Sequence, residues 1–170
     1  MSNYTSTTVH EGSMLCVTNF EQGKAIFTTD VGSPLGGRGE QPSPAQLLAA
    51  AVASCMASMM AFMGARRELN TAGISIQAGY EEGKSGITAL NFHITVPTPT
   101  TAAERAVLEA AVKNCPVGAA LAPTVEKKIS WTWAEFARRL TRQKTQTIER
   151  KGPGGASVWP LPVFLSPAPA

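Results

Sequence analysis

Three cysteines, Cys16, Cys55 and Cys115, bring the most distinctive chemistry to this 170-residue sequence. A thiolate is a nucleophile that peroxides and disulfides oxidise reversibly. Three cysteines are too few for a disulfide scaffold in a chain of this length, so a pair is more often catalytic or metal-binding. The spacings of 39 and 60 residues give no paired-ligand motif for a metal. The cysteines therefore favour thiol redox chemistry in a reducing compartment, without a metal.

Cys55 lies within a long apolar stretch whose spacing places it on one helix face with Leu48, Val52, Met59 and Phe62. A cysteine on such a face is usually an inert, small apolar side chain. A catalytic thiol in an apolar pocket is the other interpretation. From the residues alone, both interpretations stay open.

Cys115 follows one predicted helix and precedes Pro116, which is suited to open another. A sulfur at a helix start lies at the positive end of the helix dipole, which lowers a thiol pKa. The alternative is a capping cysteine without chemistry, and the residues do not decide between the two. Cys16, inside a short strand, is interpreted as structural.

The remaining chemical candidates are weaker. His10 and His93 stand alone on predicted strands and are interpreted as surface or hydrogen-bonded histidines. The glycine-rich sequence GGRG at residues 36–39 lacks the Gly-Lys-Ser/Thr of a phosphate-binding loop. We interpret these glycines as residues of tight turns.

Hydrophobic periodicity and turn residues predict an α+β domain in which helices are segregated from antiparallel strands. A Ser43-Pro44 start with Gln46 forms a capping box for a long central helix that should run to about Glu68. The other predicted elements are strands 4–10, 14–18 and 25–29 as a meander, a strand pair 74–80 and 87–96, helices 101–114 and 116–121, and a final strand 127–133.

The central helix also approaches the length of a membrane span, because residues 47–63 contain no charged side chain. The stretch consists mostly of Ala, Ser and Met, which are weak membrane anchors. An apolar helix rich in small residues is typical of a protein core or a subunit interface. We therefore expect no membrane association through this helix.

Charge divides the chain into two parts. The last 37 residues carry six Lys or Arg against two Glu, whereas residues 1–133 carry nine against ten acidic residues. A body without basic excess does not favour nucleic-acid binding. We predict a domain at 1–133, then a basic helical extension and a disordered tail rich in Pro and Gly at 134–170. The start lacks the pattern of a secretory signal, so a cytoplasmic location is expected.

Two cysteine motifs resemble those of the OsmC/Ohr family. The sequence GGRGEQPSP at residues 36–44 leads into a helix with Cys55 eleven residues after Pro44, and NCPVG at residues 114–118 resembles the second motif. The closing EKKISWTW at residues 126–133 is similar to the last strand of the family. The resemblance spans about residues 10 to 133, and PLGG at residues 34–37 is more similar to the broad OsmC-like branch.

The resemblance implies an intertwined homodimer with two active sites at the subunit interface. It implies that Cys55 attacks an organic hydroperoxide, that the resulting sulfenic acid forms a disulfide with Cys115, and that a small thiol or dithiol reduces this disulfide. No metal, flavin or other cofactor is implied.

The sequence departs from the family at one position. Members hold an arginine near the helix cysteine through a glutamate ten residues before it, and that position is Ala45 here. Arg38 is the best available cation, and Glu40 is placed to orient it from the same loop. The alternative is that both are solvated loop charges. A non-catalytic OsmC-like dimer with a binding or stress-response role is the corresponding second hypothesis.

Overall fold

The computed structural model describes residues 5–21, 25–84 and 86–135 of the chain. These residues belong to one compact unit, Met1–Glu135. The predicted strand start at residue 4 and the predicted extension and tail beyond Glu135 lie outside the described residues. The domain boundary at residue 133 therefore stays a prediction.

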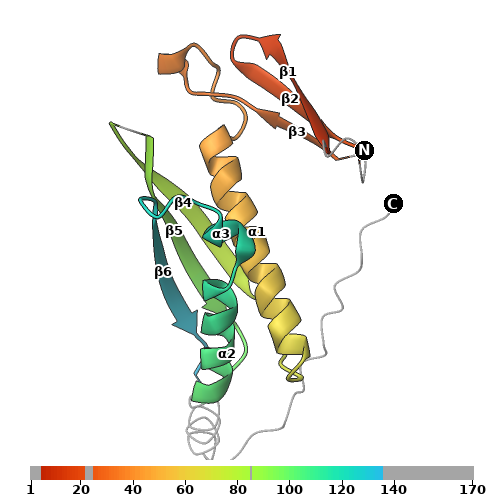
Figure 1. The fold of residues 1–170 in the computed structure, drawn as a ribbon, viewed down its shortest axis with the longest axis vertical. Helices are drawn as coiled ribbons and strands as arrows, with labels where there is room; N and C mark the ends of the chain where they lie inside the picture. The colour runs from red at the N-terminus through yellow and green to blue at the C-terminus, as the bar shows by residue number, and fades with distance from the viewer. Residues whose placement is uncertain (1–4, 22–24, 85, 136–170) are drawn as a thin grey trace, which may run out of the picture. The chain divides into compact units, whose positions relative to one another are not determined.

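The N-terminal meander is confirmed as an antiparallel sheet in the order β1-β2-β3 (Figure 1). It consists of β1 (Ser6–Gly12), β2 (Leu15–Phe20) and β3 (Ile26–Thr29). Ser13 and Met14 both have positive φ, as a tight turn with a hairpin's twist requires. Cys16 lies on β2 opposite His10 of β1 and Thr29 of β3.

The long central helix is confirmed as α1 (Pro44–Ala65), and its capping box is complete. The Ser43 side chain accepts from the backbone N–H of Gln46, whose side chain accepts in turn from the N–H of Ser43. This reciprocal pair satisfies two of the backbone donors that a helix start leaves free.

The helix ends at Ala65, earlier than the predicted end at Glu68. The N–H of Leu69 donates to the carbonyl of Gly64 at 3.0 Å, and Glu68 has a φ of 56°. A Cβ at Gly64 would lie 2.6 Å from the Thr71 side chain. The chain thus turns back tightly over Gly64, which admits the returning segment because it has no side chain.

The second sheet has the order β4-β5-β6, from β4 (Ser75–Gly83), β5 (Gly86–Val96) and β6 (Glu126–Trp133). The predicted pair β4–β5 is antiparallel, but β6 runs parallel to β5. The expectation of antiparallel strands is therefore confirmed for the other neighbouring strands and wrong for β6. The helices α2 (Ala102–Lys113) and α3 (Pro116–Ala119) carry the chain back to the beginning of β5, and such a crossover yields a parallel neighbour.

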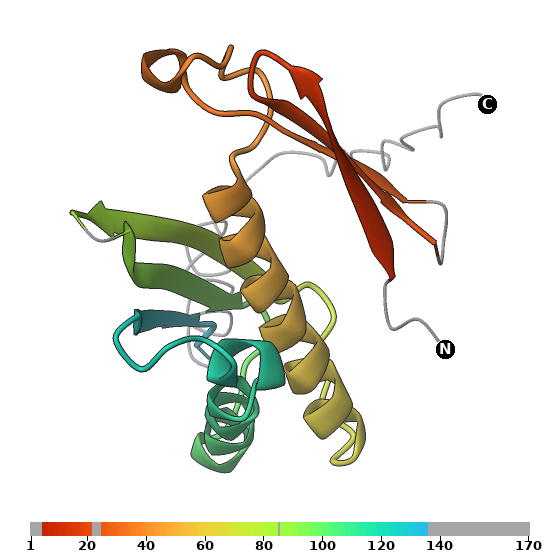
Figure 2. The same ribbon diagram turned by 45° about the horizontal axis from the view of Figure 1, so that its top comes forward.

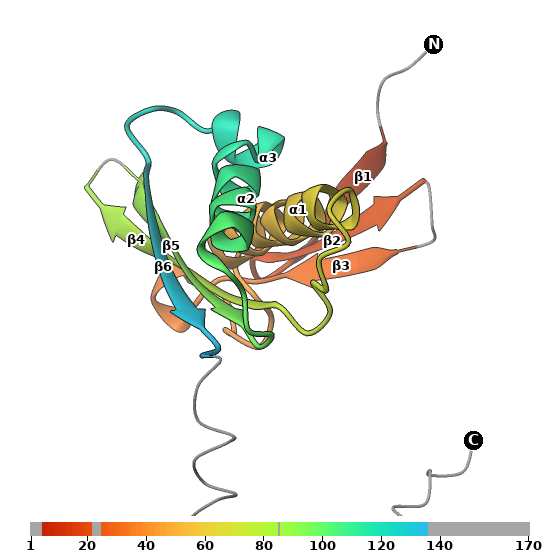
Figure 3. The ribbon, with the colours of Figure 1, turned by 90° about the horizontal axis from the view of Figure 1, so that it is seen from below.

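The helices α1 and α2 lie on one face of this sheet and leave its other face open (Figures 2 and 3). The alternating residues of β5 point at the helices, as the sequence predicted, and Phe92 and Ile94 are buried. The core combines Cys115, the N-cap of α3, with residues of α1, β5 and α2: Ala49, Val52, Ala53, Met56, Met60, Leu90, Phe92, Ile94, Val96, Leu108, Ala111 and Val112.

Helix α1 meets the length and composition of a membrane span, with a third of that window buried. Its buried seam follows Ala49, Val52, Met56, Met60 and Gly64. The predicted face is displaced from this seam, because Cys55 and Met59 are only partly buried and Phe62 is exposed. Cys55 therefore lies at the edge of the core, between its apolar interior and an uncovered side of α1.

Candidate active site

The structure brings Cys55 and Cys115 together, although 59 residues separate them along the chain. Cys55 lies about three turns from the start of α1, and Cys115 is the N-cap of α3, which packs against α1. The Cys115 side chain is 2% exposed, and Cys55 packs against the cluster that contains it. The two thiols lie close enough to influence each other, since Cys55 is one of the groups that raise the pKa of Cys115.

Backbone groups of both helices fix the Cys115 sulfur. The N–H of Gly118 donates to Cys115 Sγ at 3.3 Å, and the thiol points at the carbonyl of Val52, 4.0 Å away. Gly118 is buried, and a Cβ there would lie 3.6 Å from Cys115 Sγ and 3.7 Å from the Val52 side chain. The sulfur is thus held against α1 one turn before Cys55.

The pKa of Cys115 is raised above its ordinary value of 9.0. Burial is the largest cause, followed by the hydrogen bond to Cys55 and the repulsion between two negative sulfurs. The N–H groups of Gly118 and Val117 act in the opposite direction but do not reverse the shift. The helix start was expected to lower the pKa of Cys115, but burial outweighs this effect. Cys115 therefore remains a protonated thiol at neutral pH.

Arg38 and Glu40 lie in the loop between β3 and α1, and both side chains are exposed. Ion pairs among the described residues join Lys128 to Glu81 and Glu126, so neither Arg38 nor Glu40 takes part in one. No described hydrogen bond joins either side chain to a cysteine. The structure of a single chain therefore does not bring these two predicted site residues to the cysteine pair.

Sequence reasoning missed Asp30, which organises the loop that carries Arg38 and Glu40. Its side chain is 2% exposed, and its carboxylate accepts from the N–H groups of Val31 at 2.7 Å, Arg38 at 3.0 Å and Glu40 at 3.4 Å. The available signal was an acidic residue between a strand and a glycine-rich stretch. That signal does not reveal that backbone donors eight and ten residues away converge on this carboxylate.

Burial acts to raise the pKa of Asp30, but the backbone N–H groups that donate to the carboxylate outweigh it. The pKa of Asp30 is consequently lowered from its ordinary value of 3.8. Asp30 is an ionised carboxylate at neutral pH, and the loop is built around its charge.

The other candidates lie apart from the cysteine pair. His10 is exposed on β1, and Cys16 is a partly buried free thiol on β2. His93 is partly buried on the outer face of the second sheet, with Ser130 Oγ 2.9 Å from its Nδ1 and Thr132 Oγ1 3.1 Å from its Nε2. The interpretation of His93 as a hydrogen-bonded histidine is therefore confirmed.

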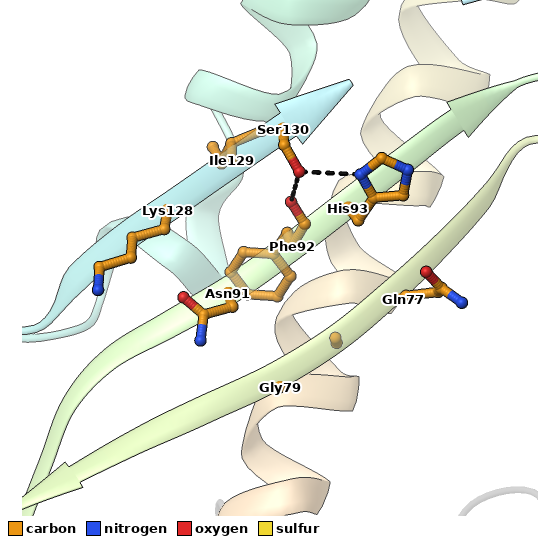
Figure 4. Close-up of a pocket in the computed structure, with 9 residues that line it drawn as sticks. Gln77, Gly79, Asn91, Phe92, His93, Lys128, Ile129 and Ser130 are labelled. Atoms are coloured by element: carbon orange, nitrogen blue, oxygen red, sulfur yellow. Dashed lines mark hydrogen bonds between the residues drawn. The ribbon is translucent and has the colours of Figure 1, made fainter. Parts of the chain in front are cut away.

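A shallow pocket occupies the same outer face, over the side-chain-free Gly79 (Figure 4). Within its lining His93 is hydrogen-bonded to Ser130, while Lys128 pairs with Glu81, outside the lining, at 2.8 Å. The pocket is lined by Gln77, Ala78, Gly79, Asn91, Phe92, His93, Lys128, Ile129 and Ser130, and none of these is a cysteine. The sheet therefore separates this pocket from the thiol pair on its helix-covered side.

The fold and site define an α+β protein with two interacting thiols between a central helix and a short helix. Residues 37–130 match the family of OsmC-like proteins, and the chain belongs to that family. No curated protein sequence matches the chain significantly.

Solved structures show the same fold at low sequence identity. A Psychrobacter arcticus protein named for osmotic stress induction and detoxification response aligns with a TM-score of 0.74 at 21% identity, over 78% of this chain and 98% of that one. The organic hydroperoxide resistance protein OsmC of Legionella pneumophila gives 0.62 at 20%, over 78% and 99%. The organic hydroperoxide resistance protein OhrB of Bacillus subtilis gives 0.56 at 16%, over 77% and 100%.

Proposed function

We propose that this protein is a cytoplasmic, thiol-dependent peroxidase that reduces organic hydroperoxides through Cys55 and Cys115. The observation that carries the proposal is that α1 and α3 bring the two thiols close together, one buried and protonated, the other at the edge of the core. The names of the Legionella and Bacillus relatives support the substrate class.

The proposed reaction needs no cofactor. The Cys55 thiolate attacks the terminal oxygen of ROOH, the O–O bond breaks, and the departing alkoxide takes a proton to give an alcohol and Cys55 sulfenic acid. The Cys115 sulfur then attacks the Cys55 sulfur, and water leaves as the disulfide forms. A small dithiol reduces the disulfide by thiol–disulfide exchange and returns both cysteines to thiols.

The two environments suit these two roles. Cys55 is partly exposed, so a peroxide reaches it without opening the core. Cys115 is buried with its proton retained, which keeps it in reserve until a sulfenic acid forms beside it. Partly buried Met59 and Met63 lie about one and two turns after Cys55 on α1 and provide an apolar surface for an alkyl group.

In this proposal Arg38 supplies the positive charge that favours the Cys55 thiolate, and Glu40 orients its guanidinium. Both side chains are exposed in the single chain, so they are available to a site completed by a second subunit.

We also propose that the protein is a homodimer. The three-stranded N-terminal sheet exposes Val9, Phe20, Ile26 and Phe27 by 39% to 65%, and α1 exposes Phe62 by 53%. A sheet of three short strands with uncovered apolar side chains on both faces needs a partner surface for stability. A second copy of the chain would supply it.

Turnover with cumene hydroperoxide and a dithiol tests the proposal. We expect Cys55→Ser to abolish hydroperoxide consumption, because its hydroxyl cannot form the sulfenic acid. Cys16→Ser is the matched control and should keep the activity of the unmodified protein. Unchanged consumption in Cys55→Ser would remove Cys55 from the nucleophile role.

A non-catalytic OsmC-like dimer with a binding or stress-response role is the second candidate. The observation that favours it is Ala45, which stands where the family has a glutamate, together with the lack of a described contact between Arg38 and Cys55. In that case Cys55 would react with hydroperoxide no faster than a free thiol.

A further inference from the structure

The single buried charge among the described residues is the Asp30 carboxylate, at the end of β3. It gathers the N–H groups of Val31, Arg38 and Glu40 and thereby joins the two ends of a long loop. A carboxylate that accepts several backbone donors fixes their positions, because each bond constrains a different part of the loop.

Further backbone contacts close the same loop. The N–H of Asp30 donates to the carbonyl of Pro42 at 3.2 Å, and the N–H of Gly39 donates to the carbonyl of Val31 at 3.1 Å. A Cβ at Gly37 would lie 2.0 Å from the Val31 carbonyl oxygen and 2.5 Å from Asp30 Oδ1. Only glycine permits this close approach, so Gly37 and Asp30 enforce one loop conformation together.

Arg38 is the residue that this loop displays. Its backbone N–H is bound to Asp30 inside the loop, while its side chain is exposed outside. The neighbouring Gly36 and Gly39 have positive φ, at 86° and 68°, so the backbone curves sharply on both sides of Arg38. The Arg38 Cα is consequently held in place, although the side chain is free to meet a partner.

We propose that Asp30 is a positioning residue, which fixes the loop so that Arg38 presents its guanidinium to the Cys55 sulfur in the assembled protein. This inference rests on the proposed role of Arg38. A cation stabilises a thiolate without a reorganisation cost only if its own backbone is already fixed. Without the Asp30 carboxylate the loop samples many conformations, and the average attraction between Arg38 and Cys55 falls.

The direction in which Asp30→Asn shifts the pH dependence of Cys55 labelling separates loss of Arg38 positioning from simple removal of a negative charge. Asp30→Asn removes a negative charge, which by itself favours a thiolate and moves Cys55 labelling to lower pH. Loss of Arg38 positioning moves the labelling to higher pH. If Asp30 had a purely structural role, Asp30→Asn would change the stability of the protein without shifting Cys55 labelling to higher pH.

The experiment measures the rate of iodoacetamide labelling at Cys55 in the full-length protein from about pH 5 to about pH 9, with the Cys55 peptide followed by mass spectrometry. We expect Arg38→Ala and Asp30→Asn each to slow labelling at neutral pH by about tenfold, as for the loss of one nearby cation. The double variant should be no slower than Arg38→Ala, because both changes remove one interaction.

Gly37→Ala is the second variant, because it disturbs the conformation of the same loop without changing charge. It tests the proposal if Asp30→Asn does not fold. It should slow labelling like Asp30→Asn, whereas the exposed control Glu82→Gln should not. The proposal would be overturned if the pH of half-maximal Cys55 labelling in Asp30→Asn and Gly37→Ala were equal to or below that of the unmodified protein. An unchanged labelling profile in Arg38→Ala would overturn it as well.

Labelling does not depend on peroxidase turnover. A protein without turnover whose labelling shifts as expected would refute the proposed function and retain the positioning role. If the protein turns over hydroperoxide but labelling does not shift in the variants, the proposed function is retained and the positioning role is refuted.

Discussion

At the scale of single residues, the environment divides two chemically identical thiols into different roles. Cys115 is buried and its pKa is raised, mainly by burial and then by Cys55. The sequence suggested the opposite for Cys115, because the helix start alone would lower a thiol pKa. Desolvation outweighs the donor groups of a four-residue helix, and this balance appears only once α1 covers the sulfur.

Asp30 yields a prediction about pH. Its folded-state pKa is lowered, so its contribution to stability is present above the ordinary value of 3.8 and is lost as pH falls through the folded-state value. The thermal midpoint of Asp30→Asn should therefore lie below that of the unmodified protein at neutral pH, and the difference should shrink in acid. The exposed variant Glu109→Gln is the control and should show a small difference throughout. A difference between Asp30→Asn and the unmodified protein that stays constant into acid would contradict this role.

At the scale of elements, local signals predicted what local physics determines. The Ser43–Gln46 capping box and the alternating residues of β5 were both visible in the sequence, because each depends on residues only two to four positions apart. The helix end at Ala65 was not visible, since it depends on the Thr71 side chain returning against Gly64. The parallel pairing of β6 with β5 was missed because it depends on the path of α2 and α3.

The candidate site, like the secondary structure, was predictable where local motifs determine it and not where distant residues do. The family motifs predicted Cys55 and Cys115 as partners, and the structure holds the two thiols close together, while their roles as a redox pair stay a prediction. Asp30 escaped prediction because its partners lie up to ten residues away along an irregular loop. The proposed contact of Arg38 with Cys55 stays a prediction, because the two side chains do not meet within the described residues of one chain.

At the scale of the whole molecule, exposed apolar side chains predict self-association. Phe62→Glu places a charge on the uncovered side of α1, where Phe62 is 53% exposed in the single chain. Burying an unpaired carboxylate is costly, so we expect the dimer dissociation constant to rise about tenfold or more. Sedimentation equilibrium would measure it, with Gln77→Glu on the open face of the second sheet as the matched control. A monomeric unmodified protein, or equal dissociation constants for all three proteins, would contradict the homodimer.

The central claim is that Cys55 and Cys115 form a redox pair that a hydroperoxide oxidises. The most direct measurement treats the full-length protein with an equimolar amount of cumene hydroperoxide and maps disulfide-linked peptides by mass spectrometry. The account predicts a Cys55–Cys115 disulfide, which disappears with a dithiol and is replaced by Cys55 sulfenic acid in Cys115→Ser. Recovery of both cysteines as free thiols, or oxidation of Cys16 in their place, would contradict it.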